Sequence, residues 1–201
     1  ICVGDYIKKW YGTKPTYVTY GGVNQVESGK LKVKNFSSKL KILFIGRLEK
    51  DTGIPVYLKA LEILRKRGVD LEFEVCGDGS FRREVEQLGI VHGFTSDLGP
   101  LIAWADFVFA SSYHSILEAF AWKKLVFSTY ENPLKRDYLI MAPFSKWLMI
   151  EKNPRRLAEK IVFYRNNENE KERMIGMAHE WVKKQTWDKV TDLYLTLWRL
   201  T

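Results

Sequence analysis

Arg47 and Lys50 follow a short apolar run, KILFIG at 41–46, and stand just before a stretch with helical spacing. The glycine that ends the run, Gly46, lets a ligand approach the backbone closely. The Arg47 guanidinium offers a planar fork for phosphate oxygens, Lys50 adds a second cation, and the helix start near Ile54 adds positive potential. The segment therefore predicts a phosphate site, while a solvated strand-to-helix loop with ordinary surface charges is the alternative.

A second candidate segment is CGDGS at 76–80, which follows another run of strand character. Gly77 and Gly79 permit the close approach of a flat or anionic group, and a tight turn is the alternative interpretation. The segment does not have the spacing G-x-G-x-x-G, so it gives no support to a dinucleotide site.

The third candidate is ASSYHSILEA at 110–119, where a buried strand gives way to small polar residues and then to a helix. Ser115 and Glu118 match a capping box, S-x-x-E. Free amides near Tyr113 to Ile116, together with two hydroxyls, predict an anion site. Glu118 has two interpretations: it only caps the helix, or its carboxylate accepts hydrogen bonds from a ribose diol.

Residues for other kinds of chemistry are sparse. The three histidines, His92, His114 and His179, form no HxH or HExxH spacing, and no DxD occurs, so we expect no dedicated metal site and no cofactor. The side chains of the adjacent His114 and Ser115 tend to point apart, and the G-x-S-x-G frame of a nucleophile elbow is absent. A serine-histidine catalytic arrangement is therefore not predicted.

Composition describes an ordinary globular chain. Its 201 residues are 46% hydrophobic and 28% charged, which suits one full-sized domain or a large domain with a small appendage. Cys2 and Cys76 form no CxxC pair, which favours reduced thiols and a cytoplasmic location. No apolar run approaches about 18 residues, and no signal peptide is recognisable. The net charge of +8 favours anionic partners: nucleotides, polyphosphates, nucleic acid or an anionic bilayer.

Short apolar runs alternate with amphipathic stretches along the chain. We expect strands at 41–46, 71–77, 90–94, 107–110, 125–129 and 147–150, and helices at 54–66, 81–88, 97–105 (capped by Ser96 or Asp97), 115–122, 154–166 and, with a break near 185–187, 168–201. This alternation predicts an α/β fold: a Rossmann-like parallel sheet of about six strands with helices on both faces. Residues 1–24 hold one strand at 17–20 and a helix, residues 27–38 are expected to form a loop, and no element is assigned to 131–143.

These segments, in this order, resemble the C-terminal domain of GT-B glycosyltransferases, in particular glycosyltransferase family 4, the glycosyl transferases group one. The resemblance covers nearly the whole chain. It is carried by the counterparts of the family's motifs, which are YGGVN at 20–24, LFIGRL at 43–48 with Gly53, GDG at 77–79, HGF at 92–94, AS at 110–111, LEAFA at 117–121, LV at 125–126 and the aromatic stretch from Trp187 to Trp198.

The resemblance implies two Rossmann-like domains that face each other across a cleft, with the nucleotide-sugar donor held by the C-terminal one. On this basis residues 1–36 would be the interdomain hinge and a remnant of a missing N-terminal domain. Residues 37–167 would be the nucleotide-sugar-binding domain. Residues 168–201 would be the C-terminal crossover helices, packed on that domain or on the missing one. The start at Ile1 agrees with a piece of a longer protein.

The resemblance also implies roles for individual residues. Arg47 would bind the donor diphosphate, Glu118 the ribose, the backbone around Phe94 the base, and the amides from His114 to Leu117 the distal phosphate. The full set expected to bind donor is Gly46, Arg47, Lys50, Gly77, Phe94, His114, Ser115, Ile116, Leu117 and Glu118. No catalytic residue is assigned. The family implies a hexosyltransferase that needs no bound metal and retains the anomeric configuration, and this chain alone would be incomplete as an enzyme.

The chain departs from the family pattern after the helix that holds Glu118, where WKKL at 122–125 replaces the usual Gly-Lys-Pro, and at two single positions. Thr52 stands where the family has a lysine before Gly53, and Ala110 stands where it has a second acid. Both favour the alternative of a non-catalytic nucleotide-binding or protein-interaction module on the same scaffold. Nucleic-acid binding is argued only by charge, so we expect no nucleic-acid partner.

The partners we expect are a nucleotide-diphosphate sugar and a glycan or lipid-linked acceptor. The apolar stripe of the C-terminal helices, with Met174, Trp181 and Trp198 among its members, is typical of core. Peripheral contact with the inner membrane face is the alternative, which a lipid-linked acceptor would suit.

Overall fold

A computed structural model describes residues 1–26 and 38–199. Its centre is a six-stranded sheet in the order β5-β4-β3-β6-β7-β8, and every neighbouring pair is parallel. The strands are β3 (Leu40–Ile45), β4 (Leu71–Cys76), β5 (Ile90–Gly93), β6 (Phe107–Ala110), β7 (Leu125–Ser128) and β8 (Met149–Ile150). The chain builds outward from β3 in one direction and from β6 in the other, so these central strands form the switch point, beyond whose carboxyl ends ligands bind in such sheets.

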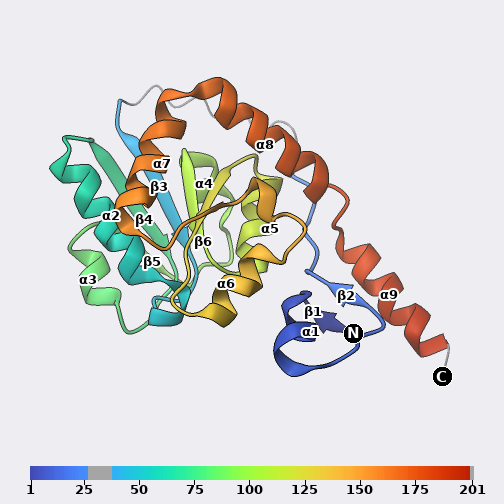
Figure 1. The fold of residues 1–201 in the computed structure, drawn as a ribbon. Coiled ribbons are helices and arrows are strands. Elements are labelled where there is room, and N and C mark those ends of the chain that lie inside the picture. The colour runs from blue at the N-terminus through green and yellow to red at the C-terminus, as the bar shows by residue number, and fades with distance from the viewer. Residues whose placement is uncertain (27–37, 200–201) are drawn as a thin grey trace.

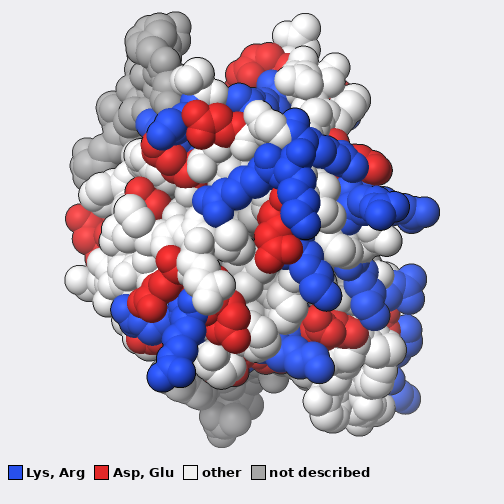
Figure 2. All heavy atoms as spheres, turned by 90° about the vertical axis from the view of Figure 1, so that its left-hand side faces the viewer, with Lys and Arg blue, Asp and Glu red and all other residues white. Residues whose placement is uncertain are grey.

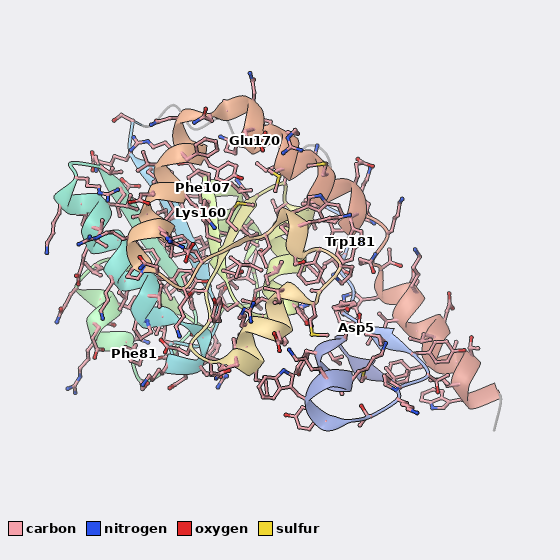
Figure 3. The ribbon with its side chains drawn as sticks, in the orientation of Figure 1. Asp5, Phe81, Phe107, Lys160, Glu170 and Trp181 are labelled. Atoms are coloured by element: carbon pink, nitrogen blue, oxygen red, sulfur yellow. The ribbon has the colours of Figure 1, made fainter. Side chains whose placement is uncertain are left out.

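The central strands are continuous apolar runs because helices cover both faces of the sheet. Alternate side chains of β3 and β6 enter two separate cores: Phe44 and Phe109 belong to one, Leu43 and Val108 to the other, and all four are completely buried. Phe107 belongs to the first core and lies beneath α7 (Figure 3).

One group of helices covers the first core and another covers the second (Figure 1). The first group is α2 (Ile54–Lys66), α3 (Arg82–Glu86) and α7 (Pro154–Asn166), and the second is α4 (Gly99–Trp104) and α5 (Tyr113–Ala121). α8 (Glu168–Val182) contributes Met174 to the first core and Val182 to the second, so it closes the same edge of both. Two single turns, η2 (Lys50–Thr52) and η3 (Ser145–Trp147), and the short helix α6 (Pro133–Ile140) complete this part.

A small unit precedes the sheet. Strands β1 (Cys2–Val3) and β2 (Val18–Thr19) form their own two-stranded parallel sheet, with α1 (Tyr6–Tyr11) between them. The unit is attached to α6 through Asp137, whose buried carboxylate accepts hydrogen bonds from Lys9 Nζ at 2.6 Å and Trp10 Nε1 at 3.0 Å. The last helix, α9 (Trp187–Arg199), extends beside this unit, so both termini lie at one end of the molecule (Figure 1).

The expected α/β fold, its six parallel strands and the helix at 54–66 are confirmed. The expected capping box is wrong: α5 begins at Tyr113, and Ser112 caps it by accepting from Ser115 N at 3.4 Å. The helix expected from residue 97 begins at Gly99, and the Asp97 side chain accepts a hydrogen bond from the Gly99 amide at 3.2 Å, so of the two expected caps it is Asp97 that serves the helix start. The unassigned segment 131–143 contains α6, and residues 27–37 of the expected loop lie outside the described residues.

Candidate functional site

A cleft of about 350 Å³ opens beyond the carboxyl ends of the central strands. Phe44, Ile45 and Cys76 form its floor, at the ends of β3 and β4. The remaining lining comes from four places in the sequence: Gly46, Arg47, Asp51 and Thr52 after β3; Phe94, Thr95 and Leu98 after β5; Ser111 and Ser112 after β6; and Lys135 on α6. The cleft therefore occupies the switch point of the sheet, where the topology predicts a ligand site.

Arg47 and Asp51 form an ion pair on the rim of this cleft. Arg47 Nη2 lies 2.6 Å from Asp51 Oδ2, and both side chains are more than half exposed. An exposed pair of this kind contributes little stability, so a phosphate can compete for the guanidinium. The Thr52 hydroxyl lies 2.9 Å from the carbonyl oxygen of Arg47 and 2.7 Å from that of Glu49, so it serves the local turn.

Behind the cleft, a buried hydroxyl network holds the end of β6. Ser111 Oγ lies 2.9 Å from Tyr57 Oη and donates to the carbonyl oxygen of Thr129 at 3.2 Å. Tyr57 Oη also donates to the carbonyl of Phe127 and accepts from the amide of Thr129, both at 3.1 Å. Burial raises the pKa of Tyr57 far above its ordinary value, so the phenol stays protonated as a donor. The network fixes Ser111 against the cleft floor.

The amides at the start of α5 are mostly used within the protein. Tyr113 N donates to Tyr138 Oη at 2.7 Å, and the amides of Ser115 and Ile116 donate to Ser112. Within the described part of the chain, the amide of His114 has no partner. The helix start thus offers less free donor capacity than the sequence suggests.

Lys135 enters the cleft from α6. Its Nζ lies 4.1 Å from the centre of the Tyr138 ring, and it forms no ion pair with any residue in 1–26 or 38–199. Burial lowers the pKa of Lys135 to about 8, and the nearby Asp51 partly opposes that shift. On the cleft floor, burial raises the pKa of the Cys76 thiol to about 11, so this thiol is protonated and unreactive at neutral pH.

The glycines at the strand ends allow two backbone segments to lie very close together. A side chain at Gly77 would place its Cβ 1.8 Å from the carbonyl oxygen of Gly46, and φ of Gly77 is +149°. Only glycine fits this crossing between the ends of β3 and β4. Gly77 therefore shapes the floor of the cleft without lining it.

The structure brings Gly46, Arg47 and Phe94 together in the cleft, with the Phe94 side chain 80% exposed at its rim. Other residues of the expected set lie outside the lining: Lys50 and Gly77 after β3 and β4, and His114, Ser115, Ile116, Leu117 and Glu118 on α5. The side chains of Ile116 and Leu117 are completely buried, and the His114 ring lies 5.9 Å from that of Trp187. Their expected contacts with donor stay predictions.

Sequence reasoning missed Asp51 and Lys135 as lining residues. Asp51 lies four positions after Arg47, in the loop for which the sequence predicts a phosphate site. The spacing of these opposite charges could therefore have identified Asp51 as a neighbour of Arg47. Lys135 lies in a segment without a recognisable motif, and only the packing of α6 places it in the cleft.

Charge outside the cleft is spread over the surface. Figure 2 shows Lys and Arg side chains across one face, with Asp and Glu among them. Several are paired, as in Arg82 with Asp78 and Glu86, both at 2.8 Å. In the described ranges, no three His, Cys, Asp or Glu side chains gather as they would around a metal ion. None of the helices described in 1–26 and 38–199 combines the length and apolar character needed to span a membrane.

Comparison with known proteins gives a consistent picture. Residues 28–181 match the family model for glycosyl transferases group 1. A curated relative, alpha-D-kanosaminyltransferase of Streptomyces kanamyceticus, is 36% identical over 47 residues, which are 23% of this chain and 12% of that protein.

Solved structures with the same fold include a glycosyltransferase from Rickettsia africae (TM-score 0.73, 18% identity, 98% of this chain and 62% of that one). S. aureus TarM, a variant solved with fondaparinux, alpha-GlcNAc-glycerol and UDP, has a TM-score of 0.70 at 16% identity over 97% of this chain and 43% of that one. Anabaena HepE with UDP and glucose has a TM-score of 0.66 at 15% identity over 89% and 56%. The chain thus spans about half the length of these proteins, and a smaller share of the curated relative.

Proposed function

The chain belongs to the glycosyl transferases group 1 family, and from this premise we propose that it is the donor-binding part of a glycosyltransferase that uses a nucleoside-diphosphate sugar. The observation that carries the proposal is the position of the cleft: Arg47, Ser111 and Ser112 line one cleft at the switch point of the sheet. TarM and HepE, which share the fold, were solved with UDP, and this supports a nucleotide as the ligand.

The reaction breaks the bond between the anomeric carbon and the diphosphate oxygen. The diphosphate leaves with the electron pair, the acceptor hydroxyl oxygen forms the new glycosidic bond, and the hydroxyl proton is released. Charge therefore develops on the leaving diphosphate, where the guanidinium of Arg47 stabilises it. We include retention of the anomeric configuration in the proposal, on the strength of the family resemblance.

We propose that residues 1–36 form a hinge and the end of a further domain, that 37–167 bind the donor, and that 168–201 contact that further domain. Exposed apolar side chains on this side of the molecule support the proposal. Val3 is 52% exposed, Tyr11 62% and Trp187 44%, and they belong to the small N-terminal unit and to α9. Apolar surface of this kind is typical of an interface.

The acceptor in this proposal is a glycan or a lipid-linked hydroxyl, and the location is the cytoplasm. A lipid-linked acceptor suits peripheral contact with the inner membrane face. The net charge of +8 supports such contact, because anionic headgroups attract basic proteins.

A second candidate function, a nucleotide-binding module without transferase activity, has one observation in its favour. Ala110 occupies the position of the family's second acid and is completely buried at the end of β6. Transfer from a radiolabelled nucleotide sugar, measured with this chain together with the further domain proposed above, separates the two functions, because a non-catalytic module binds nucleotide and transfers no sugar even when that domain is present.

Calorimetry with UDP, GDP, ADP and dTDP tests donor binding. We expect one of them to bind and R47A to weaken it by about tenfold or more, as for a charge-assisted hydrogen bond. R83A is the matched control, because Arg83 is exposed on α3 outside the cleft. E118Q should weaken nucleotide binding and leave inorganic diphosphate unaffected if Glu118 holds the ribose. Absence of binding at millimolar ligand, or binding that R47A leaves unchanged, contradicts the proposed function.

A further inference from the structure

Helix α6 is fixed rigidly to the start of α5. The rings of Tyr113 and Tyr138 stack with centroids 3.8 Å apart and planes 10° from parallel. Two hydrogen bonds join the same residues: Tyr138 Oη accepts from Tyr113 N, and Tyr113 Oη donates to the carbonyl of Tyr138. Asn132 caps α6 by accepting from Lys135 N at 2.8 Å, and Pro133 occupies its first turn. The position of Lys135 relative to the cleft is therefore set by packing.

The charges that line the cleft nearly cancel without Lys135. Arg47 contributes one positive charge and Asp51 one negative charge, and the two side chains are paired at 2.6 Å. Ser111, Ser112, Thr52 and Thr95 contribute no charge. Lys135 is the source of the net positive charge among the lining residues. An anion that enters the cleft is attracted by this net charge, since the paired Arg47 alone offers little field.

Lys135 also lacks the anionic partner that a half-buried ammonium requires. Its Nζ contacts the face of the Tyr138 ring, and no carboxylate of the described residues forms an ion pair with it. A buried charge without a partner is costly, and a bound anion removes that cost. Lys50, the other lysine of this region, is exposed on η2 and does not line the cleft.

We propose that Lys135 is a phosphate-binding residue of this cleft, which holds the diphosphate of a nucleotide between α6 and Arg47, above Ser111 and Ser112. The inference rests on the proposed function and adds to it a cation from an element outside the strand-to-helix loops. Thr52 lines the same cleft but carries no charge, and its hydroxyl is already engaged with the backbone of its own turn.

Protonation of Lys135 gives the proposal a second, independent readout. Burial lowers the pKa of Lys135 to about 8, Asp51 and Arg47 are the charged groups that face it, and the serines packed nearby do not titrate. A phosphate beside the ammonium raises this pKa, so nucleotide binding takes up protons near pH 8 and weakens as the pH rises above that value. At pH 6 to 7 the lysine is already charged, and the proton uptake disappears.

The test compares K135M, K135R and K59M with the wild-type chain in calorimetry with the nucleoside diphosphate that binds, the matching nucleoside, and inorganic diphosphate. K135M keeps a long unbranched side chain at this position and removes the charge. We expect K135M to weaken nucleoside diphosphate and inorganic diphosphate by about tenfold or more, with the nucleoside unchanged. K135R should restore most of the affinity, and K59M should resemble wild type, because Lys59 is exposed on α2 and does not line the cleft.

Proton uptake is measured by repeating the titration near pH 8 in buffers of different ionisation enthalpy. We expect about 0.3–0.5 proton per nucleoside diphosphate in wild type and close to none in K135M. If R47A weakens binding and K135M does not, the role of Lys135 is refuted while the proposed function stands. If K135M weakens the nucleoside as strongly as the diphosphate, the residue is structural and the inference is wrong. If no nucleoside diphosphate binds wild type, both proposals fail.

Discussion

Replacing Tyr57 by phenylalanine removes a single hydroxyl from the centre of the network behind the cleft. The side chain is completely buried, and its ring stacks on Phe109 with centroids 4.6 Å apart. Phenylalanine keeps that stacking and fills the same space. The amide of Thr129 loses its acceptor, the carbonyl of Phe127 loses a donor, and Ser111 keeps its bond to Thr129. The perturbation is therefore confined to polar groups in a site without water access.

The magnitude follows from the groups left unsatisfied. A buried amide without an acceptor costs about 1–3 kcal/mol, and each ordinary hydrogen bond contributes about 1 kcal/mol. We expect Y57F to lower the free energy of unfolding by about 2–3 kcal/mol. For a chain of this size that corresponds to a fall in Tm of about 4–12 °C.

Urea unfolding followed by tryptophan fluorescence and by far-ultraviolet circular dichroism measures the change. The slope of the free energy of unfolding against urea concentration should be unchanged, which shows that the substitution acts on stability. The matched control is Y164F, because the Tyr164 hydroxyl makes no hydrogen bond with the described residues although its ring contacts Phe127. A loss below about 0.5 kcal/mol in Y57F, the scatter of neutral surface substitutions, would refute the reasoning.

Two further predictions concern the walls of the cleft. G77A should lower the free energy of unfolding by about 3 kcal/mol or more, because its Cβ would lie 1.8 Å from a carbonyl oxygen of the neighbouring strand end at a positive φ. The control G176A, on an exposed helix face with open space, should raise the free energy of unfolding by about 0.5–1 kcal/mol. Equal effects of the two substitutions in urea unfolding would contradict this account. D51N removes the negative partner of Arg47 from the rim of the cleft, so a nucleoside diphosphate should bind about threefold tighter at low salt. Calorimetry should show no such gain for E159Q, because the ion pair of Glu159 lies outside the cleft. An unchanged affinity in D51N would contradict the inference that the charges lining the cleft control binding.

The local sequence was sufficient to predict a helix start where residues adjacent in the chain decide the structure. Asn153 followed by Pro154 predicted the start of α7, and the Asn153 side chain does accept from the amides of Arg155 and Arg156. At α5 the same kind of reasoning chose the wrong serine. Ser112 and Ser115 both suit a cap, and the choice depends on Tyr113, which must be inside the first turn to be buried against Tyr138. That contact joins residues 25 positions apart, so no local pattern reports it.

Gly77 shows the same difference between what the sequence indicates and what the fold decides. The sequence indicated that Gly77 has a special role, since a glycine after a strand permits close approach. The partner in that approach was open, a ligand or a turn of the chain itself. In the structure the partner is the carbonyl of Gly46, the residue directly after the neighbouring strand β3. The sequence alone indicated that this position requires a glycine. Which group the glycine approaches could be identified only from the order of strands in the sheet.

By itself the sequence determined the class of fold and the edge of the sheet where the cleft opens, because both follow from hydrophobic periodicity and from residues that lie next to each other in the chain. It located Arg47 after the first sheet strand for the same reason. Only the tertiary structure decided that Lys135, and not Lys50, shares the cleft with Arg47. The physical reason is that a charge acts through space over a few ångströms, and the distance between Arg47 and a residue almost ninety positions later is fixed by the packing of α6 on α5.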